Sequence, residues 1–150
     1  MKLRSCFIDS NIVVYANDRN EVNSNRQARA IEVITGCMKA RNGVISIQVL
    51  QEYANTALNK LQQDPPVVLR QLKLLESFHI VTPSPRIVRR AVEIKNSYRL
   101  SFWDAGIIAA AEAADCDLIL SEDLNTDQYY AGVEVINPLV SGFLISEIIS

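Results

Sequence analysis

Two short apolar runs in this sequence end in a carboxylate. Residues 6–8 stop at Asp9, with Asn11 two positions later, and residues 118–120 stop shortly before Asp123. Read as strands of a parallel sheet, both runs end at the same edge, where sheets of this kind bind their ligands. The extended i, i+2 spacing aims Asp9 and Asn11 the same way. Asp and Asn are also common cap and turn residues there, so each acid alone has a purely structural alternative.

Two further acids fall on predicted helices. Asp104 lies three residues after Ser101, as in a capping box, yet the apolar residues that follow place it on the apolar face of its helix. A carboxylate there is expensive to bury alone, and lysine and arginine are scarce nearby, so a cation is the expected partner. Glu52 falls opposite the apolar stripe of its helix, a position typical of an ordinary solvated glutamate.

The residue types in this set favour a hard metal ion. The chain has a single histidine, His79, in an apolar run, and three widely spaced cysteines. It therefore offers neither a zinc pattern nor a disulfide framework, and a Ser-His-Asp triad is disfavoured. Carboxylate oxygens without histidine or thiolate suit Mg²⁺ or Mn²⁺. Such a site is suited to phosphodiester hydrolysis, because the ion activates a water and stabilises the leaving oxygen.

Apolar runs alternate with amphipathic stretches, which predicts an α/β fold of three layers with a mostly parallel, five-stranded sheet. The predicted strands are residues 3–8, 43–47, 78–81, 118–120 and 133–136. Helices are predicted over 23–40 and, from capping residues and prolines, after Ser46, Asp64, Ser84 and Ser101. Residues 139–149 are expected as a short helix or an extended tail.

Composition excludes several classes of protein. With 150 residues, 49% of them hydrophobic and 21% charged, the chain is expected to form one domain over residues 1–150. No segment approaches the roughly 20 apolar residues of a membrane span, and none resembles a signal peptide. The cysteine usage is typical of a reducing compartment. We therefore expect a cytoplasmic protein without a membrane partner.

The net charge of −2 provides no global basic field of the kind that non-specific DNA-binding proteins carry. Contact with a nucleic acid would have to use local basic groups or a bound metal ion. The densest basic cluster consists of Arg86, Arg89, Arg90, Lys95 and Arg99. These residues fall on the polar side of a predicted helix, so a plain solvated face is an equally good interpretation.

Four motifs resemble those of the PIN-domain nucleases, in the order and at the spacing of that family. They are Phe7-Ile8-Asp9-Ser10-Asn11, Ser46-Ile47-Gln48-Val49-Leu50-Gln51-Glu52, Leu100-Ser101-Phe102-Trp103-Asp104-Ala105 and Leu120-Ser121-Glu122-Asp123-Leu124. The segment 135–138 is similar to the family's usual last strand. Each motif is short, but together they cover essentially the whole chain.

The resemblance implies a parallel sheet of strand order 3-2-1-4-5 and a site for Mg²⁺ or Mn²⁺. Its metal-binding and catalytic acids correspond to Asp9, Glu52, Asp104 and Asp123. Asn11 and Ser121 match polar positions that support the site. None of the four acids departs from the family pattern, so the resemblance implies a catalytically competent ribonuclease.

With its Ser-Glu-Asp fourth motif, the chain is most similar to the VapC-type toxins of bacterial toxin–antitoxin pairs. That similarity implies an RNA substrate, a cognate antitoxin and a homodimer. A housekeeping PIN nuclease and a PIN scaffold that only binds partners are the alternatives within the family.

Two alternatives lie outside the PIN family. A haloacid-dehalogenase-type phosphatase also begins with an aspartate after its first strand, but needs a second aspartate where this chain has Asn11. A receiver-like domain would need a lysine near the end of its fifth strand, and residues 133–138 contain none.

Overall fold

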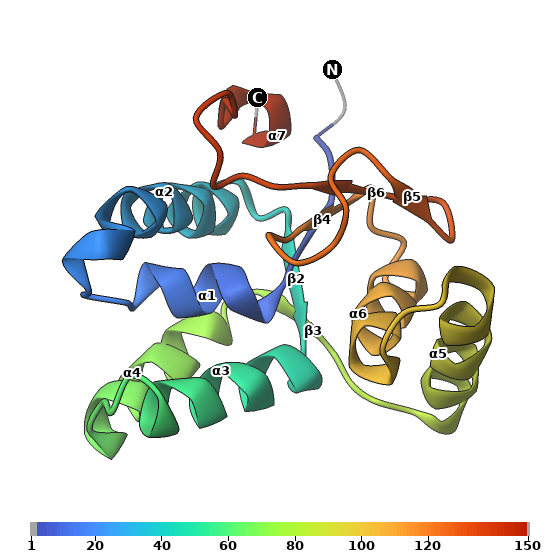
Figure 1. Cartoon of the computed structure of the whole chain (residues 1–150), viewed down its shortest axis with the longest axis horizontal. Coiled ribbons are helices and arrows are strands. Elements are labelled where there is room, and N and C mark those ends of the chain that lie inside the picture. The colour runs from blue at the N-terminus through green and yellow to red at the C-terminus, as the bar shows by residue number, and fades with distance from the viewer. Residues whose placement is uncertain (1–2, 150) are drawn as a thin grey trace.

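Figure 1 shows the computed structural model of the chain, which describes residues 3–149. Residues 1, 2 and 150 of the predicted domain lie outside the described residues. The elements are β1 (Cys6–Ile8), α1 (Ser10–Ala16), the 3-10 helix η1 (Glu21–Asn23), α2 (Ser24–Ala40), β2 (Gly43–Ser46), α3 (Ile47–Asn59), α4 (Pro65–Leu75), β3 (His79–Val81), α5 (Pro85–Tyr98), α6 (Phe102–Ala113), β4 (Leu118–Leu120), β5 (Tyr129–Tyr130), β6 (Val133–Ile136) and α7 (Ser146–Ile149).

The sheet has the strand order β3-β2-β1-β4-β6-β5. Its first five strands in this order are parallel to their neighbours, and β5 runs antiparallel to β6. The predicted order 3-2-1-4-5 is confirmed, with β6 as the predicted fifth strand. The count of five is wrong by one, because β5 has only two residues and is too short to show an alternating pattern.

Helices cover both faces of this sheet. Figure 1 shows α1 to α4 on one side and the α5–α6 pair on the other. The central strands β1 and β4 are buried along their whole length, as expected of strands covered on both faces. Helix α1 was not predicted, because its seven residues leave little room for a helical pattern. Among residues 3–149, no helix is both long and apolar enough to cross a bilayer.

Serine caps set where three of the helices begin. The hydroxyl oxygens of Ser46, Ser84 and Ser101 each accept a hydrogen bond from the backbone N–H three residues later, at 3.3, 3.2 and 3.1 Å. The three predicted serine caps are therefore confirmed. Asp64 also lies at the predicted N-cap of α4, but its side chain makes no capping hydrogen bond. Because Ser46 also ends β2, its cap places α3, which carries Glu52, directly at the carboxyl edge of the sheet.

Gly43 begins β2, the strand that leads to this cap. A Cβ atom at Gly43 would lie 2.4 Å from the ring of Phe78 and 3.3 Å from the Cβ of Cys37. Phe78 is buried, so its ring has little space into which it can retreat. The absence of a side chain at Gly43 lets the aromatic ring pack directly on the strand.

We predict that Gly43→Ala lowers the free energy of unfolding by about 1–3 kcal/mol, the usual effect of forcing an extra methyl group into a packed core. Gly142→Ala is the matched control, because a Cβ there would have no atom within 4 Å. Urea denaturation of both variants measures the difference. Equal midpoints for the two variants would show that the contact with Phe78 relaxes without loss of stability.

Candidate functional site

Asp9 lies where the buried strand β1 turns into α1. Its Oδ1 accepts a hydrogen bond from the Ser10 backbone N–H at 2.7 Å. Its Oδ2 accepts hydrogen bonds from the Ser121 hydroxyl at 2.8 Å and from the Asn11 amide at 3.3 Å. Asp9 is only 4% exposed, so protein donors replace most of the water that a carboxylate normally binds.

Burial raises the pKa of Asp9 to about 6. The hydrogen bonds from Ser121 and Ser10 oppose that rise, while the negative charges of Glu52 and Asp123 add to it. Three carboxylates from distant parts of the sequence therefore influence one another electrostatically. In the ionised state this arrangement is unfavourable unless a cation offsets the charge.

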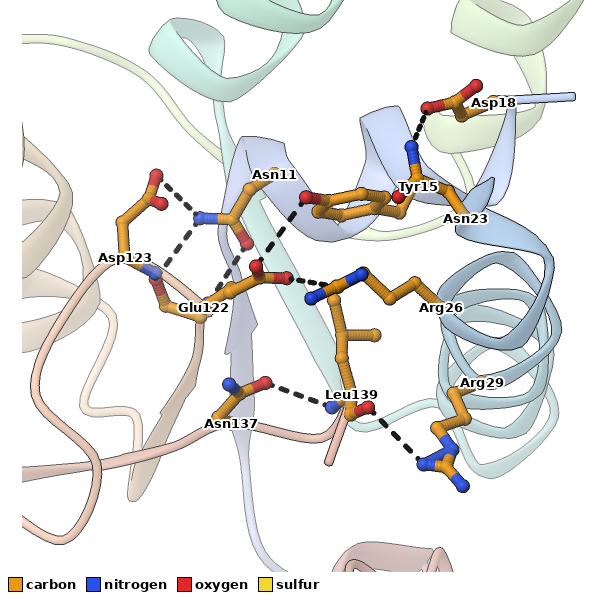
Figure 2. Close-up of polar contacts among 11 residues, drawn as sticks. Asn11, Tyr15, Asp18, Asn23, Arg26, Arg29, Glu122, Asp123, Asn137 and Leu139 are labelled. Atoms are coloured by element: carbon orange, nitrogen blue, oxygen red, sulfur yellow. Dashed lines mark hydrogen bonds and ion pairs between the residues drawn. The ribbon is translucent and has the colours of Figure 1, made fainter. Parts of the chain in front are cut away.

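Asn11 joins the two acidic segments at this edge of the sheet. Its amide Nδ2 donates to Oδ2 of Asp123 at 3.0 Å and lies 3.2 Å from the Ser121 hydroxyl oxygen. Its Oδ1 accepts a hydrogen bond from the Glu122 backbone N–H at 3.2 Å (Figure 2). Because the same amide also contacts Asp9, one side chain holds both carboxylates in relation to each other.

Ser121 is fully buried beneath this pair of acids. While its hydroxyl donates to Asp9, its oxygen accepts from the backbone N–H groups of Asp123 at 3.1 Å and Leu124 at 3.4 Å. The hydroxyl thus connects the end of β1 to the loop that follows β4. Asn11 and Ser121, the supporting residues that the family resemblance implied, thus both donate to the Asp9 carboxylate, and their role in a catalytic site stays a prediction.

A second set of contacts holds the loop that carries Asp123 against α1 and α2. The Glu122 carboxylate lies 3.5 Å from both the Tyr15 hydroxyl and Nε of Arg26 (Figure 2). The Arg26 guanidinium also lies over the Tyr15 ring, 5.7 Å from its centroid. Sequence reasoning missed Tyr15 and Arg26, because their role depends on how α1 and α2 pack against the loop.

Glu52 projects from α3 toward the same edge. Its Oε1 accepts from the Ser10 hydroxyl at 3.0 Å, and its Oε2 accepts from the Gln48 amide at 3.2 Å. The helical pattern predicted a solvated glutamate, and that interpretation is wrong, since Glu52 is half-buried and held at both oxygens. Gln48 was also missed, although its i, i+4 spacing to Glu52 indicated a shared helix face.

Asp104 stands apart from this network. It is half-buried, and its carboxylate accepts no hydrogen bond within residues 3–149. Its link to the other acids is indirect, because Gln48 donates at 2.9 Å to the carbonyl oxygen of Trp103, the preceding residue. Asp104 was expected to be buried on the apolar face of its helix. That expectation is wrong in its degree, because the first turn of α6 leaves Asp104 partly exposed to solvent.

The donor chemistry fits Mg²⁺ or Mn²⁺, because carboxylate oxygens are the ligands these ions prefer. Within residues 3–149, no three histidine, cysteine or acidic side chains gather closely enough to hold an ion. Mg²⁺ usually needs only one or two carboxylates and keeps several waters. The pair formed by buried Asp9 and exposed Asp123, both oriented by the Asn11 amide, meets that smaller requirement.

The predicted basic cluster is divided along α5. Arg90 forms two hydrogen bonds with Glu112, at 2.7 and 3.0 Å, and these contacts raise the pKa of its guanidinium. Glu112 lies eight residues beyond Asp104 on α6, about 12 Å along the helix axis. Lys95 and Arg99 lie toward the opposite end of α5, where the chain turns into α6. Of the five basic residues, Arg90 is thus paired with the Glu112 carboxylate, whereas Lys95 and Arg99 lie away from that pair.

Comparison with known proteins identifies the family. The PIN domain matches residues 6–132, whereas the comparison with curated protein sequences gives no significant match. A toxin–antitoxin complex from Klebsiella pneumoniae is 21% identical, with a TM-score of 0.66, and the match covers 89% of this chain and 98% of that chain. VapC20 of Mycobacterium tuberculosis, a toxin that cleaves the sarcin-ricin loop, is 16% identical, with a TM-score of 0.65 and coverage of 79% and 92%.

A protein of Pyrobaculum aerophilum is 17% identical, with a TM-score of 0.60, and the match covers 89% of this chain and 90% of that chain. At these identities the likeness to solved structures concerns the fold. The family match spans the first strand, all four acids and the strand after the Asp123 loop. This chain therefore belongs to the PIN domain family.

Proposed function

We propose that this chain is a ribonuclease that hydrolyses phosphodiester bonds with a divalent metal ion held by Asp9, Glu52, Asp104 and Asp123. The main support is Asp9, a buried carboxylate whose pKa is raised by burial and, to a smaller extent, by repulsion from the charges of Glu52 and Asp123. A divalent cation would remove that repulsion. The PIN family is a family of nucleases, which agrees with this chemistry.

The chain's own residues have distinct tasks in this proposal. Asp9 and Asp123 are the two metal-holding acids already joined in the structure, because Asn11 donates hydrogen bonds to both carboxylates. Ser10 and Gln48 orient Glu52. When bound, Mg²⁺ or Mn²⁺ supplies a water of lowered pKa and offsets the negative charge of the phosphate. Asp104 is supplied by the first turn of α6.

A groove of about 480 Å³, to which Asp123 contributes, would give the RNA backbone a route to the site. It starts at Ser10, Asn11 and Asp123 and extends along α1 to Lys60. Hydroxyl and amide groups on its walls can bind phosphate and ribose oxygens without a strong basic field. This agrees with a chain of net charge −2.

We further propose that the chain is the toxin of a toxin–antitoxin pair, acting in the cytoplasm as a homodimer with a cognate antitoxin. The shared fold with a toxin–antitoxin complex and with VapC20 supports this assignment. A housekeeping nuclease or a non-catalytic scaffold would lack a neighbouring gene for a small DNA-binding antitoxin. Growth arrest on expression, relieved by that neighbour, would distinguish the toxin from both.

Purified protein should cut RNA in Mg²⁺ or Mn²⁺ and stop in EDTA. Attack by water rather than by the ribose 2′-hydroxyl should leave 5′-phosphate and 3′-hydroxyl ends. Asp9→Asn and Asp104→Asn should each lower the cleavage rate at least about 100-fold. Asp127→Asn is the matched control, because Asp127 is an exposed loop residue outside the four acids. Cyclic 2′,3′-phosphate products, or full activity in both site variants, would contradict the proposal.

Asp9→Asn should also stabilise the metal-free protein at pH 7.5, on the order of 2 kcal/mol. The folded-state pKa of about 6 lies above the ordinary value of 3.8, so ionised Asp9 opposes folding above pH 6. The gain should fade as the pH falls from 6 to 4, where wild-type Asp9 becomes protonated. Thermal denaturation in EDTA across this range tests it. A variant less stable than the wild type at pH 7.5 would mean that the hydrogen bonds outweigh desolvation.

Replacing Lys95 and Arg99 together by alanine should weaken RNA binding similarly for all RNA sequences. The slope of the logarithm of the binding constant against the logarithm of the salt concentration should become smaller in magnitude by up to about 2. The control pair Arg86→Ala/Arg89→Ala lies toward the far end of α6, beside Glu112, and should leave the slope unchanged. Both are compared in the Asp9→Asn background, which should not cut the RNA. Equal slopes for the two pairs would assign Lys95 and Arg99 to plain solvation.

A further inference from the structure

Trp103 is the only tryptophan of the chain, and it is 63% exposed. It lies in the first turn of α6, immediately before Asp104. The Phe102 ring packs edge-to-face against it, with centroids 5.2 Å apart and an interplanar angle of 81°. A large aromatic ring is therefore presented to solvent beside one of the four acids.

Trp103 forms one wall of an apolar groove of about 170 Å³ between α5, α6 and the end of β3. An engineered protein cavity of about 150 Å³ is large enough to hold benzene, so this groove can hold one planar aromatic ring. Its apolar walls include Val81, Pro83, Ile87, Ala91, Phe102 and Trp103. The side chains of Gln48 and Gln51 add polar groups that can hydrogen-bond the edge of such a ring.

Gln48 connects this groove to the acids. The same amide that lines the groove donates to Oε2 of Glu52 and to the carbonyl oxygen of Trp103. A Cβ at position 106 would lie 2.6 Å from Oε1 of Gln48, so a larger residue than Gly106 would force this side chain to move. Only the Gln48 side chain would therefore separate a ring stacked on Trp103 from Glu52, and Asp104 is the residue that follows Trp103 in the sequence.

We propose that this groove binds one unpaired base of the RNA substrate, stacked on Trp103, and so determines which phosphodiester reaches the acids. The proposal rests on the ribonuclease function proposed above. Stacking suits this site because an aromatic face binds a base without needing a positive charge, and the chain has a net charge of −2. The groove has room for a single ring, which is the size of one unpaired base, and it lies beside the proposed catalytic acids.

The lone tryptophan makes the stacking directly observable. In the Asp9→Asn background with Mg²⁺, a short single-stranded RNA should quench Trp103 fluorescence in a saturable manner. The same RNA annealed to its complement should quench much less, because its bases are already stacked and paired. Quenching that is absent, or equal for single strand and duplex, would overturn the proposal.

Affinity, measured by anisotropy of a labelled RNA in the same background, tests the role of the ring. Trp103→Ala should weaken binding about tenfold, and Trp103→Phe should restore most of the loss, because phenylalanine also stacks. Tyr129→Ala is the matched control, since Tyr129 is 60% exposed and lies on β5 at the sheet edge. Melting temperatures show whether the variants remain folded.

In the protein with wild-type Asp9, Trp103→Ala should lower kcat/KM for cleavage about tenfold. The variant should also cleave the same RNA at a larger number of phosphodiester bonds than the wild type does. Unchanged affinity and cut positions would overturn the stacking role while leaving the ribonuclease function intact. Loss of self-association in Trp103→Ala with unchanged RNA affinity would assign the groove to a protein contact and overturn the proposal. A wild type that binds and quenches but never cuts RNA would instead remove the ribonuclease function.

Discussion

The site depends on one constraint, the burial of a carboxylate at the end of a central strand. Because β1 lies between β2 and β4 and is fully buried, the residue that follows it is buried as well. Ionised Asp9 is tolerable there only with donors around it, and Ser10, Asn11 and Ser121 provide them. The same donors tie α1 to the loop after β4. Satisfying Asp9 therefore also brings Asp123 to the site.

Glu52 and Asp104 are positioned by a separate set of contacts. Gln48 spans from α3 to the start of α6, and its hydrogen bonds hold Glu52 on one side and the Trp103 carbonyl on the other. The two sets meet at Ser10, whose backbone N–H binds Asp9 and whose hydroxyl binds Glu52. The rigid part of the site is thus the Asp9–Asn11–Ser121 group, and Asp104 has the most freedom to adjust to a metal ion.

The arrangement of positive charge explains how an acidic chain could still act on RNA. Two of its arginines form ion pairs with glutamates. Arg26 pairs with Glu122 in the loop after β4, and Arg90 on α5 pairs with Glu112 on α6. Those pairs stabilise the loop after β4 and the α5–α6 packing rather than forming a phosphate-binding surface. Most of the affinity for a polyanion would then come from a metal ion at the acids and from stacking on Trp103, with Lys95 and Arg99 adding the part that depends on salt.

The sequence by itself determined the chain positions of the serine caps, because a cap depends on local hydrogen bonding. The strand order followed from the family resemblance and not from any local pattern. The sequence also indicated that Asp9 and Asp123 share one edge, since parallel strands end on the same side. The surroundings of Glu52 and Asp104 were decided only by tertiary structure. A helical wheel shows which side of a helix is polar, but not that a glutamine on α3 reaches across to α6. In that contact the Gln48 side chain lies close to Gly106, on a helix that packs beside α3 only in the folded chain.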